Sequence, residues 1–400
     1  MISFEHALQL TLDHMPILGM EEVSLLDAVD RITVVDLNGR VDSPSANVSL
    51  KDGYAIQSAD IAAARENAAV ALRVVGSVAA GGEWPGQLGP GEAVRILSGA
   101  PVPQGANAVI AEEFTRLDGY TLHVLNDAYP GRNILPQASD VRAGALLVAK
   151  GSRLSPPAVG LLAAAGHQSV PVVKRPSVAI LATGDEVVAP GEPLLPGRLY
   201  ASNLVTLGAW CRRYGFSVET IVVKDDARQI REKLLASLQD FDAVITSGGA
   251  WRSERDMVVR MLDELNWRKY YHRVRIGPGK AVAFGIYDDK KPAFCLPGGP
   301  PSNHIAFLQL ALPGVLALSG RKDAGLPVRM VRLAEPISGR VDWTQFKHGK
   351  LKAGEDLPSF RPLNPPSRLQ MMATSDAIVR IPEGVSQIEQ GQIVEAQLLR

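Results

Sequence analysis

Four loops between residues 183 and 300 carry carboxylate, hydroxyl or proline residues, three of them together with glycine, a pattern typical of sites for phosphates and hard cations. They are Thr183-Gly184-Asp185-Glu186, Asp225-Asp226, Ser247-Gly248-Gly249 and Pro297-Gly298-Gly299-Pro300. Glycine lets backbone amides approach an anion closely, and a following helix N-terminus favours negative charge. Carboxylates beside a phosphate can also hold Mg²⁺, which takes oxygen ligands and keeps several waters. The loops therefore predict a site for phosphate groups.

Apolar runs typical of buried strands precede these loops. The runs are Ser177–Ala182, Val218–Val223, Ala243–Ile245 and Ala293–Leu296. Helical patterns and one more strand follow them, with helices at Ser202–Tyr214, Ile230–Leu238, Glu254–Leu265 and from Asn303, and the strand at Ala281–Ile286. Such alternation predicts a parallel sheet covered by helices on both faces. Because ligands of such sheets bind outside the carboxyl ends of the strands, we expect the four loops on one rim.

Two of these loops, and the acids after the third, also have a purely structural explanation. A Ser-Gly-Gly sequence is often a plain tight turn, and Glu254 and Asp256 suit a helix start, where acids stabilise by about 0.3–1 kcal/mol. Asp225 and Asp226 can cap the next helix as readily as they bind a metal. The two acids after Thr183 follow a buried strand, where they are costly without a partner. The convergence of all four loops favours a functional site.

The composition excludes several other classes of protein. Of the 400 residues 46% are apolar, and 42 basic residues balance 42 acidic ones, which is typical of a soluble protein with a large core. No apolar stretch reaches the roughly 18 residues of a membrane span, and Met1–His6 lacks a signal-peptide pattern, so we expect a cytoplasmic protein. The separate Cys211 and Cys295 argue against disulfides and structural zinc. Scattered histidines and the lack of basic blocks argue against nucleic-acid binding.

The residues outside this segment follow other patterns. Helical spacing is present at Ile2–Asp13, Ser24–Val35 and Pro157–Ala165, whereas Ala69–Leu125 has short alternating runs separated by glycine-containing pairs. This predicts an antiparallel β-rich domain inserted into a helical segment. Short strands after Gly320 predict a C-terminal β domain. The α/β multidomain chain is thus divided into a helical linking domain (1–43 and 135–175), an inserted β-rich domain (44–134), a parallel α/β sheet domain (176–322) and a C-terminal β domain (323–400).

Six motifs, in order and at matching spacing, cover almost the whole chain. They are Asp52-Gly53-Tyr54-Ala55, Leu97-Ser98-Gly99-Ala100-Pro101-Val102-Pro103, Thr183-Gly184-Asp185-Glu186, Ser247-Gly248-Gly249, Gly277-Pro278-Gly279-Lys280 and Leu296-Pro297-Gly298-Gly299-Pro300. Together they resemble the molybdopterin molybdenumtransferases, which include the bacterial MoeA proteins and the E domain of gephyrin. The resemblance implies an elongated homodimer of four-domain subunits, in which the α/β domain binds molybdopterin and has the fold of the molybdopterin adenylyltransferases.

The resemblance also implies an activity in molybdenum cofactor biosynthesis. In this family adenylylated molybdopterin is hydrolysed in a Mg²⁺-assisted step, molybdate or tungstate enters the dithiolene and AMP leaves; the adenylyltransferase and apo-molybdoenzymes are possible partners. Cleaving a phosphoanhydride needs charge neutralisation and alignment more than a covalent nucleophile. That agrees with a sequence that has no credible Ser-His-Asp or Cys-His arrangement.

Carried over motif by motif, the resemblance implies a site built across the dimer. Catalytic roles are expected for Asp52, Ser98, Asp140 and Glu186. Substrate-binding roles are expected for Thr183, Gly184, Ser247, Gly248, Gly249, Ser253, Lys280, Pro297, Gly298 and Pro300. Metal-binding roles are expected for Asp185, Glu186, Asp225 or Asp226, and Asp256.

The chain departs from the family pattern beside these positions. The departures are the run Asn47–Lys51, the segment Ala250–Ser253, Gly277 and Gly299. We hypothesise that the fold and the pterin substrate are shared but that the oxyanion, or the way it is held, differs, with tungstate as the obvious candidate. Trp251 would then stack on the pterin and Arg252 pair with a phosphate, unless both simply pack on their own domain.

Two other functions compete with metal insertion. A scaffold that holds molybdopterin and docks partner enzymes would share the pterin site without catalysing the transfer. A related nucleotide hydrolase would share the sheet domain, but it would lack the inserted domain that carries Ser98-Gly99-Ala100-Pro101. Release of AMP from adenylylated molybdopterin separates an enzyme from a scaffold.

Overall fold

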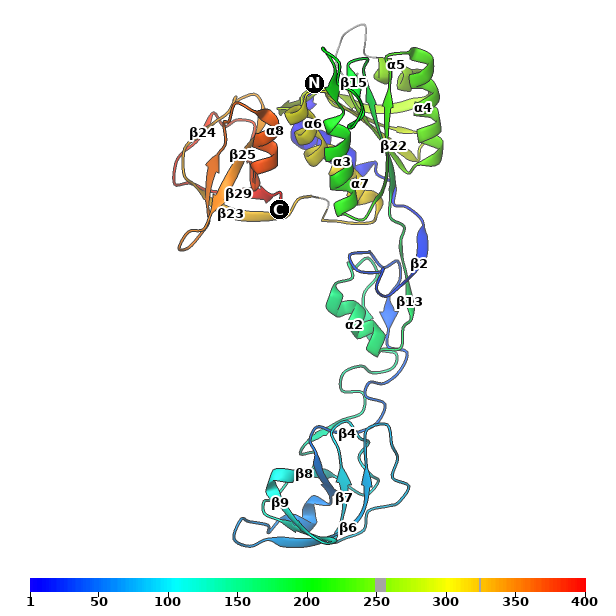
Figure 1. Cartoon of the computed structure of the whole chain (residues 1–400), viewed down its shortest axis with the longest axis vertical. Coiled ribbons are helices and arrows are strands. Elements are labelled where there is room, and N and C mark those ends of the chain that lie inside the picture. Colours follow the sequence, from blue (N-terminus) through cyan, green and yellow to red (C-terminus); the bar gives the residue numbers. More distant parts are fainter. Residues whose placement is uncertain (249–256, 324) are drawn as a thin grey trace. The chain divides into compact units, whose positions relative to one another are not determined.

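The computed structural model describes residues 1–248, 257–323 and 325–400. The chain divides into two compact units (Figure 1). Unit 1 joins Met1–Glu21 to Val173–Arg400, and unit 2 is the continuous segment Glu22–Val172. Among the described residues, no helix is long and apolar enough to cross a membrane. The finer division into four domains stays a proposal.

Unit 1 contains a six-stranded sheet of the order β17-β14-β18-β22-β21-β19. The strands are β17 (Ser217–Val223), β14 (Ser177–Thr183), β18 (Ala243–Ser247), β22 (Lys291–Leu296), β21 (Ala283–Tyr287) and β19 (Trp267–His272). The first four are parallel, as predicted. Strand β21 runs antiparallel to both of its neighbours, β22 and β19. Three residues join β21 to β22, whereas a parallel crossover needs a dozen or more. The sheet is therefore mixed at one edge.

Helices cover both faces of this sheet (Figure 1). On one side lie α3 (Ser202–Arg213), α6 (Pro300–Ala306) and α7 (Leu312–Leu318), with a π-helical turn at Phe307–Ala311 between the last two. On the other lie α4 (Ala227–Asp240) and α5 (Met257–Glu264). Alternate residues of β14 enter the two cores: Ile180 packs with the first group, and Leu181 with the second. This burial on both faces explains why the strands are continuous apolar runs.

The N-terminal helix α1 (Phe4–Asp13) also belongs to unit 1. Its N-cap Ser3 accepts a hydrogen bond from the His6 amide, and Phe4 and Ala7 are buried in the same core as α7. Two residues before the helix form β1 (Ile2–Ser3), which pairs with β20 (Val274–Gly277). The helix predicted at this end of the chain is therefore present, and it packs on the α/β domain.

The C-terminal segment completes unit 1 with a seven-stranded sheet. Its order is β1-β20-β25-β26-β23-β29-β27. The further strands are β23 (Val328–Leu333), β25 (Thr344–Lys352), β26 (Ser359–Pro362), β27 (Ala377–Ile381) and β29 (Ile393–Leu398), with β24 (Ile337–Ser338) pairing with β28 (Gln387–Ile388) beside them. Helix α8 (Arg368–Thr374) begins at the N-cap Ser367, whose hydroxyl accepts from the Gln370 amide. The predicted C-terminal β domain is confirmed.

Unit 2 is built on a six-stranded sheet of the order β8-β5-β7-β6-β10-β9. The strands are β5 (Gly53–Ile56), β6 (Val70–Val78), β7 (Glu92–Ile96), β8 (Ala108–Ala111), β9 (Thr115–Asp118) and β10 (Thr121–Val124). All pairs are antiparallel except β6 with β7. Short ribbons pair β2 (Met20–Ser24) with β13 (Ser169–Val173), β3 (Leu37–Asn38) with β12 (Leu146–Val148) and β4 (Val48–Ser49) with β11 (Ile134–Leu135).

Of the two helices predicted in unit 2, one is present and one is not. Helix α2 (Pro156–Ala164) forms with Ser155 as its N-cap and proline in its first turn. The helix predicted at Ser24–Val35 is wrong, because that segment is a series of turns and bridges. Its apolar residues do not share one face: Ala28 is fully buried, whereas Leu26 is 88% exposed.

Candidate functional site

Glycines bring the ends of the parallel strands in unit 1 close together. Gly184 has φ of 146° and Gly248 has φ of 99°, so both lie in conformations that other residues rarely adopt. A Cβ on Gly248 would lie 3.0 Å from the carbonyl oxygen of Thr183. A Cβ on Gly184 would lie 2.7 Å from the Glu186 carboxylate. Gly184 and Gly248 are therefore required by their backbone conformation, and a Cβ on Gly248 would also crowd the backbone of Thr183.

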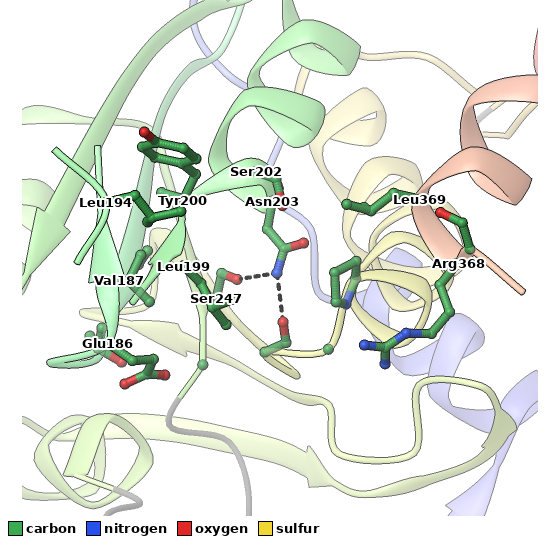
Figure 2. Close-up of a pocket in the computed structure, with 18 of the residues that line it drawn as sticks. Glu186, Val187, Leu194, Leu199, Tyr200, Ser202, Asn203, Ser247, Arg368 and Leu369 are labelled. Carbon is green, nitrogen blue, oxygen red and sulfur yellow. Dashed lines mark hydrogen bonds between the residues drawn. The ribbon is translucent and has the colours of Figure 1, made fainter. Parts of the chain in front are cut away.

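A cavity of about 850 Å³, here called the rim cavity, lies over these strand ends (Figure 2). Its lining includes predicted site residues from three of the four loops: Thr183, Glu186, Ser247, Gly248, Gly298 and Pro300. Leu194, Leu199 and Tyr200 add an apolar wall, and Ser202 and Asn203 add the first residues of α3. The loops after β14, β18 and β22 thus open into one space.

The floor of the rim cavity is a hydrogen-bonded network that sequence reasoning missed. The Nδ2 atoms of Asn203 and Asn303 each donate to the Ser247 hydroxyl at 3.0 Å. Asn203 Nδ2 also donates to the Gly298 carbonyl at 2.8 Å, and Asn303 Nδ2 to the Pro297 carbonyl at 2.9 Å. The only sequence signal was the position of each asparagine in the first turn of a helix after a site loop.

Among the described residues that line the rim cavity there is one cation, and it comes from the C-terminal domain. Arg368 begins α8, and it lines the cavity together with Pro366, Ser367 and Leu369 (Figure 2). Within the described part of the chain its guanidinium has no hydrogen-bond or ion-pair partner, although the cavity also contains the Glu186 carboxylate. No sequence pattern indicated this residue, because its position depends on how the C-terminal domain packs.

The acids expected to bind metal separate into different environments. Asp185 accepts a hydrogen bond from the Asp225 amide at 3.3 Å, so these two carboxylates lie on neighbouring loops. Asp226 is the N-cap of α4 and accepts a hydrogen bond from the Gln229 amide at 2.8 Å. It therefore caps a helix, which was the alternative to a metal-binding role. Over residues 1–248, 257–323 and 325–400, no group of three or more His, Cys, Asp or Glu is arranged to hold a metal. The described oxygen donors suit a Mg²⁺ ion that takes one or two carboxylates and completes its shell with water and phosphate.

Part of the predicted site lies outside the described residues. This applies to Gly249, Ser253, Glu254 and Asp256, and to the Trp251 and Arg252 side chains of the variant segment.

The Gly277–Lys280 motif lies at the end of β20 in the other sheet of unit 1. Gly279 approaches the start of α6, where a Cβ would lie 3.1 Å from the Ser302 carbonyl oxygen. Lys280 is exposed and is not part of the rim cavity lining. The motif therefore supports the helix that follows the Pro297–Pro300 loop.

Unit 2 brings two of its predicted catalytic residues together. The Ser98 amide donates to the Asp52 carboxylate at 2.7 Å, and both residues are exposed. Asp52 precedes Gly53, which must be glycine because a Cβ there would collide with the Ile110 carbonyl. Asp140 is also exposed, and its amide donates to the Ser43 carbonyl at 3.0 Å.

Two buried histidines lie behind the rim cavity. His304 of α6 accepts from the Trp210 indole at 3.1 Å and stacks on His348 of β25, with ring centroids 5.7 Å apart. Burial, and then the neighbouring His348, lowers the pKa of His304 to about 3, and burial lowers the pKa of His348 to about 4. Both rings are therefore neutral at physiological pH, and they pack α6 against the C-terminal domain.

Known proteins match every part of this chain. Family profiles match the MoeA N-terminal region (domains I and II) over residues 2–166, a probable molybdopterin binding domain over 179–317 and the MoeA C-terminal region (domain IV) over 330–399. The chain is 31% identical over 356 residues to the molybdopterin molybdenumtransferase of Haemophilus influenzae, covering 86% of this chain and 85% of that protein. It is 30% identical over 390 residues to a putative molybdopterin biosynthesis protein of Methanocaldococcus jannaschii, covering 95% and 92%.

Solved structures agree with these sequence similarities. Two MoeA molybdopterin biosynthesis proteins of Pyrococcus horikoshii are similar over the whole of this chain, at 32% and 26% sequence identity and TM-scores of 0.85 and 0.83. The first match covers 99% of the solved chain, and the second covers 100%.

Proposed function

The chain belongs to the MoeA family of molybdopterin molybdenumtransferases, and from that premise we propose that its rim cavity binds adenylylated molybdopterin for the insertion of a metal oxyanion. As a member of that family it is a transferase of molybdenum cofactor biosynthesis that acts on molybdopterin. What remains to be assigned is where the substrate sits and which side chains act on it.

One observation carries the proposal: residues from three separate glycine-containing loops line a single cavity. The cavity volume of about 850 Å³ suits a nucleotide-sized ligand, since ordinary ligand sites occupy roughly 300–1,000 Å³. The apolar wall of Leu194, Leu199 and Tyr200 offers a surface for a flat pterin or adenine ring. Arg368 and the Ser247 hydroxyl offer positive charge and a donor to its anionic groups.

Glu186 is the carboxylate best placed for catalysis. It lines the rim cavity three residues after Thr183, and its side chain is exposed there. A carboxylate in this position holds a water molecule and accepts its proton as the phosphoanhydride is cleaved. Asp185 and Asp225 would hold Mg²⁺ beside it, and the ion, when bound, neutralises charge on the phosphate oxygens.

The residues of unit 2 complete the proposed site from a second subunit. Asp52, Ser98 and Asp140 carry polar groups on exposed loops, where they are accessible to a partner. We propose that the homodimer brings them to the rim cavity of the other copy, and that the enzyme works in the cytoplasm with the adenylyltransferase and apo-molybdoenzymes as partners. Variants of Asp52 mixed with variants of Glu186 test this arrangement, because heterodimers of two inactive subunits would regain one intact site.

Release of AMP is the decisive measurement. Purified protein with adenylylated molybdopterin, Mg²⁺ and molybdate is expected to release AMP in step with the formation of molybdenum cofactor. A scaffold protein would bind the substrate and leave AMP unreleased, and that outcome would refute the assignment of catalysis to this cavity.

The preference between oxyanions needs a separate experiment. We propose that the altered loops, including Trp251 and Arg252, adapt the site to tungstate. Competition between molybdate and tungstate in the same assay tests this, and equal preference would refute it. If Trp251 stacks on the pterin, Trp251→Ala lowers molybdopterin affinity, whereas an unchanged affinity removes that role.

A further inference from the structure

We propose that Asn203 is a positioning residue which forces the Ser247 hydroxyl to donate a hydrogen bond to an anionic oxygen of the substrate. The inference rests on the proposed binding of molybdopterin in the rim cavity. It adds that Asn203 determines whether the Ser247 hydroxyl donates or accepts a hydrogen bond there. It concerns how the site recognises the oxygen atoms of a phosphate or a metal oxyanion.

The orientation of both asparagine side chains follows from their partners. Asn203 faces the Gly298 carbonyl at 2.8 Å, and Asn303 faces the Pro297 carbonyl at 2.9 Å. A backbone carbonyl can only accept, so each asparagine must present its Nδ2 atom to it. The second hydrogen of each Nδ2 then points at Ser247 Oγ, 3.0 Å away in both cases.

The state of the Ser247 hydroxyl follows in turn. A hydroxyl oxygen has two lone pairs and one hydrogen, and here both lone pairs accept from amides. Its own hydrogen therefore has to be donated, and among the described residues no acceptor for it is present. Ser247 is 5% exposed and lines the rim cavity, so its free hydrogen is directed to a ligand. An unmet donor in a nearly buried position is unfavourable until a ligand oxygen satisfies it.

The same contacts join two site loops to α3. Asn203 lies in the first turn of α3, Ser247 ends β18, and the Gly298 carbonyl belongs to the loop after β22. One side chain thus fixes the distance between both loops as well as the direction of the hydroxyl hydrogen. Asn303 is 1% exposed and secures the same hydroxyl from beneath, whereas Asn203 lines the cavity and can be substituted with less damage to the core.

The substitution Asn203→Asp tests this role, because it keeps the shape and removes both N–H donors. The carboxylate it introduces can only accept, so the Ser247 hydroxyl turns toward it and away from the ligand. It also adds negative charge, which repels an anionic substrate whether or not the hydroxyl matters. A double-mutant cycle with Ser247→Ala cancels that charge effect, since it is present in both Asn203→Asp proteins.

The measurement is the Kd for molybdopterin of the wild type, Asn203→Asp, Ser247→Ala and the double variant. Ser247→Ala is expected to raise the Kd about ten- to hundredfold, the value of a hydrogen bond to a charged group. Asn203→Asp should raise the Kd at least as much, and the double variant should bind about ten- to hundredfold tighter than the product of the two single effects predicts. Asn266→Asp makes the same chemical change outside the cavity lining and should leave the Kd unchanged.

Several outcomes would overturn the inference. Effects that multiply in the double variant would show that Asn203 acts independently of the hydroxyl, as a merely structural residue would. An unchanged Kd for Ser247→Ala would refute the donor role, even if Asn203→Asp failed to fold. A wild type that does not bind molybdopterin would refute the proposed function, and the inference with it, whereas a binding wild type with an additive cycle refutes the inference alone.

Discussion

The rim cavity of unit 1 and the Asp52–Ser98 pair of unit 2 carry equally specific motifs. They differ in how many hydrogen bonds hold their side chains in place. In the rim cavity, Ser247 accepts two hydrogen bonds, and each asparagine that donates to it also donates to a loop carbonyl. In unit 2 the Asp52 carboxylate accepts one backbone amide and is otherwise exposed. The first site is preorganised to bind, whereas the second presents a reactive group whose surroundings are incomplete within its own unit.

The largest effect is expected for Glu186→Gln. This change keeps the shape of the side chain but removes the proton acceptor from the rim cavity, so AMP release should fall about a thousandfold, within the range for loss of a general base. The Kd for molybdopterin should change little, because Asn203, Ser247 and Arg368 are untouched. Steady-state kinetics measure the rate of AMP release, and equilibrium binding measures the Kd. A variant with full activity would remove Glu186 from the mechanism.

Asp52→Ala should reduce kcat about a hundredfold while the KM stays the same, because unit 2 is proposed to act on a substrate already held by unit 1. Asp52→Asn should retain the hydrogen bond from the Ser98 amide through its Oδ1 atom. It therefore separates the charge of Asp52 from its contribution to the loop. A rise in KM with constant kcat would contradict the division of roles between the two regions.

Acid is expected to destabilise unit 1 through the buried His304–His348 pair. Their folded-state pKa values of about 3 and about 4 lie below the unfolded value of 6.5. The unfolded chain therefore binds protons first as the pH falls, and stability is lost from pH 6.5 down to about pH 4 for His348 and about pH 3 for His304. At pH 5 each histidine should cost about 2 kcal/mol relative to pH 8. Urea unfolding at both pH values should show a weaker pH dependence for His348→Phe than for the wild type; equal slopes would contradict this account.

Arg368→Ala should raise the Kd for molybdopterin about tenfold, since an anionic group loses a charged donor. Arg368→Lys should recover only part of the affinity. Lysine keeps the positive charge, but it cannot bind an oxyanion through two parallel hydrogen bonds. The exposed Gln370 on the same helix supplies a control in Gln370→Ala. If Arg368→Ala binds as tightly as the wild type, the Arg368 guanidinium has no part in recognition.

The smallest effect is expected for Asp226→Ala, which removes the N-cap of α4 and should cost about 1 kcal/mol of stability. Activity at saturating Mg²⁺ should be unchanged, because Asp226 is engaged with the Gln229 amide. A shift in the Mg²⁺ concentration needed for half-maximal activity would instead make Asp226 a metal ligand. Asp226→Asn, which keeps a capping oxygen, distinguishes the two roles.

Sequence reasoning succeeded where a local pattern determines the structure. The four parallel strands were predicted because burial on both faces makes them apolar runs. The glycine-containing loops were then expected at strand ends, because each of them follows such a run. Strand β19 was missed, since Arg268 and Lys269 are exposed and its sequence resembles a surface loop. The helix at Ser24–Val35 was wrongly predicted, because the spacing of its apolar residues suggested one face that the fold does not use.

The loops that form the site could be predicted from the sequence. The contacts between side chains of different elements could not. The motif residues Thr183, Ser247 and Gly298 were identified before the fold was known, and they line one cavity. Arg368 enters the same cavity from a domain far along the chain, and no local pattern encodes that approach. The pairing of Asn203 with Ser247 depends on atomic distances between separate elements, which a sequence of residue types does not contain.

The discontinuity of unit 1 has a consequence for synthesis on the ribosome. Unit 2 is one continuous segment, so all of its contacts are available once residue 172 has emerged. The first 21 residues belong to unit 1, where Phe4 and Ala7 pack with helix α7, and Ile2 pairs with Val274. The opening segment of the polypeptide must therefore wait, with its apolar face uncovered, until more than two hundred further residues have been translated. Apolar surface that stays exposed during that interval is prone to aggregation, which chaperones counteract.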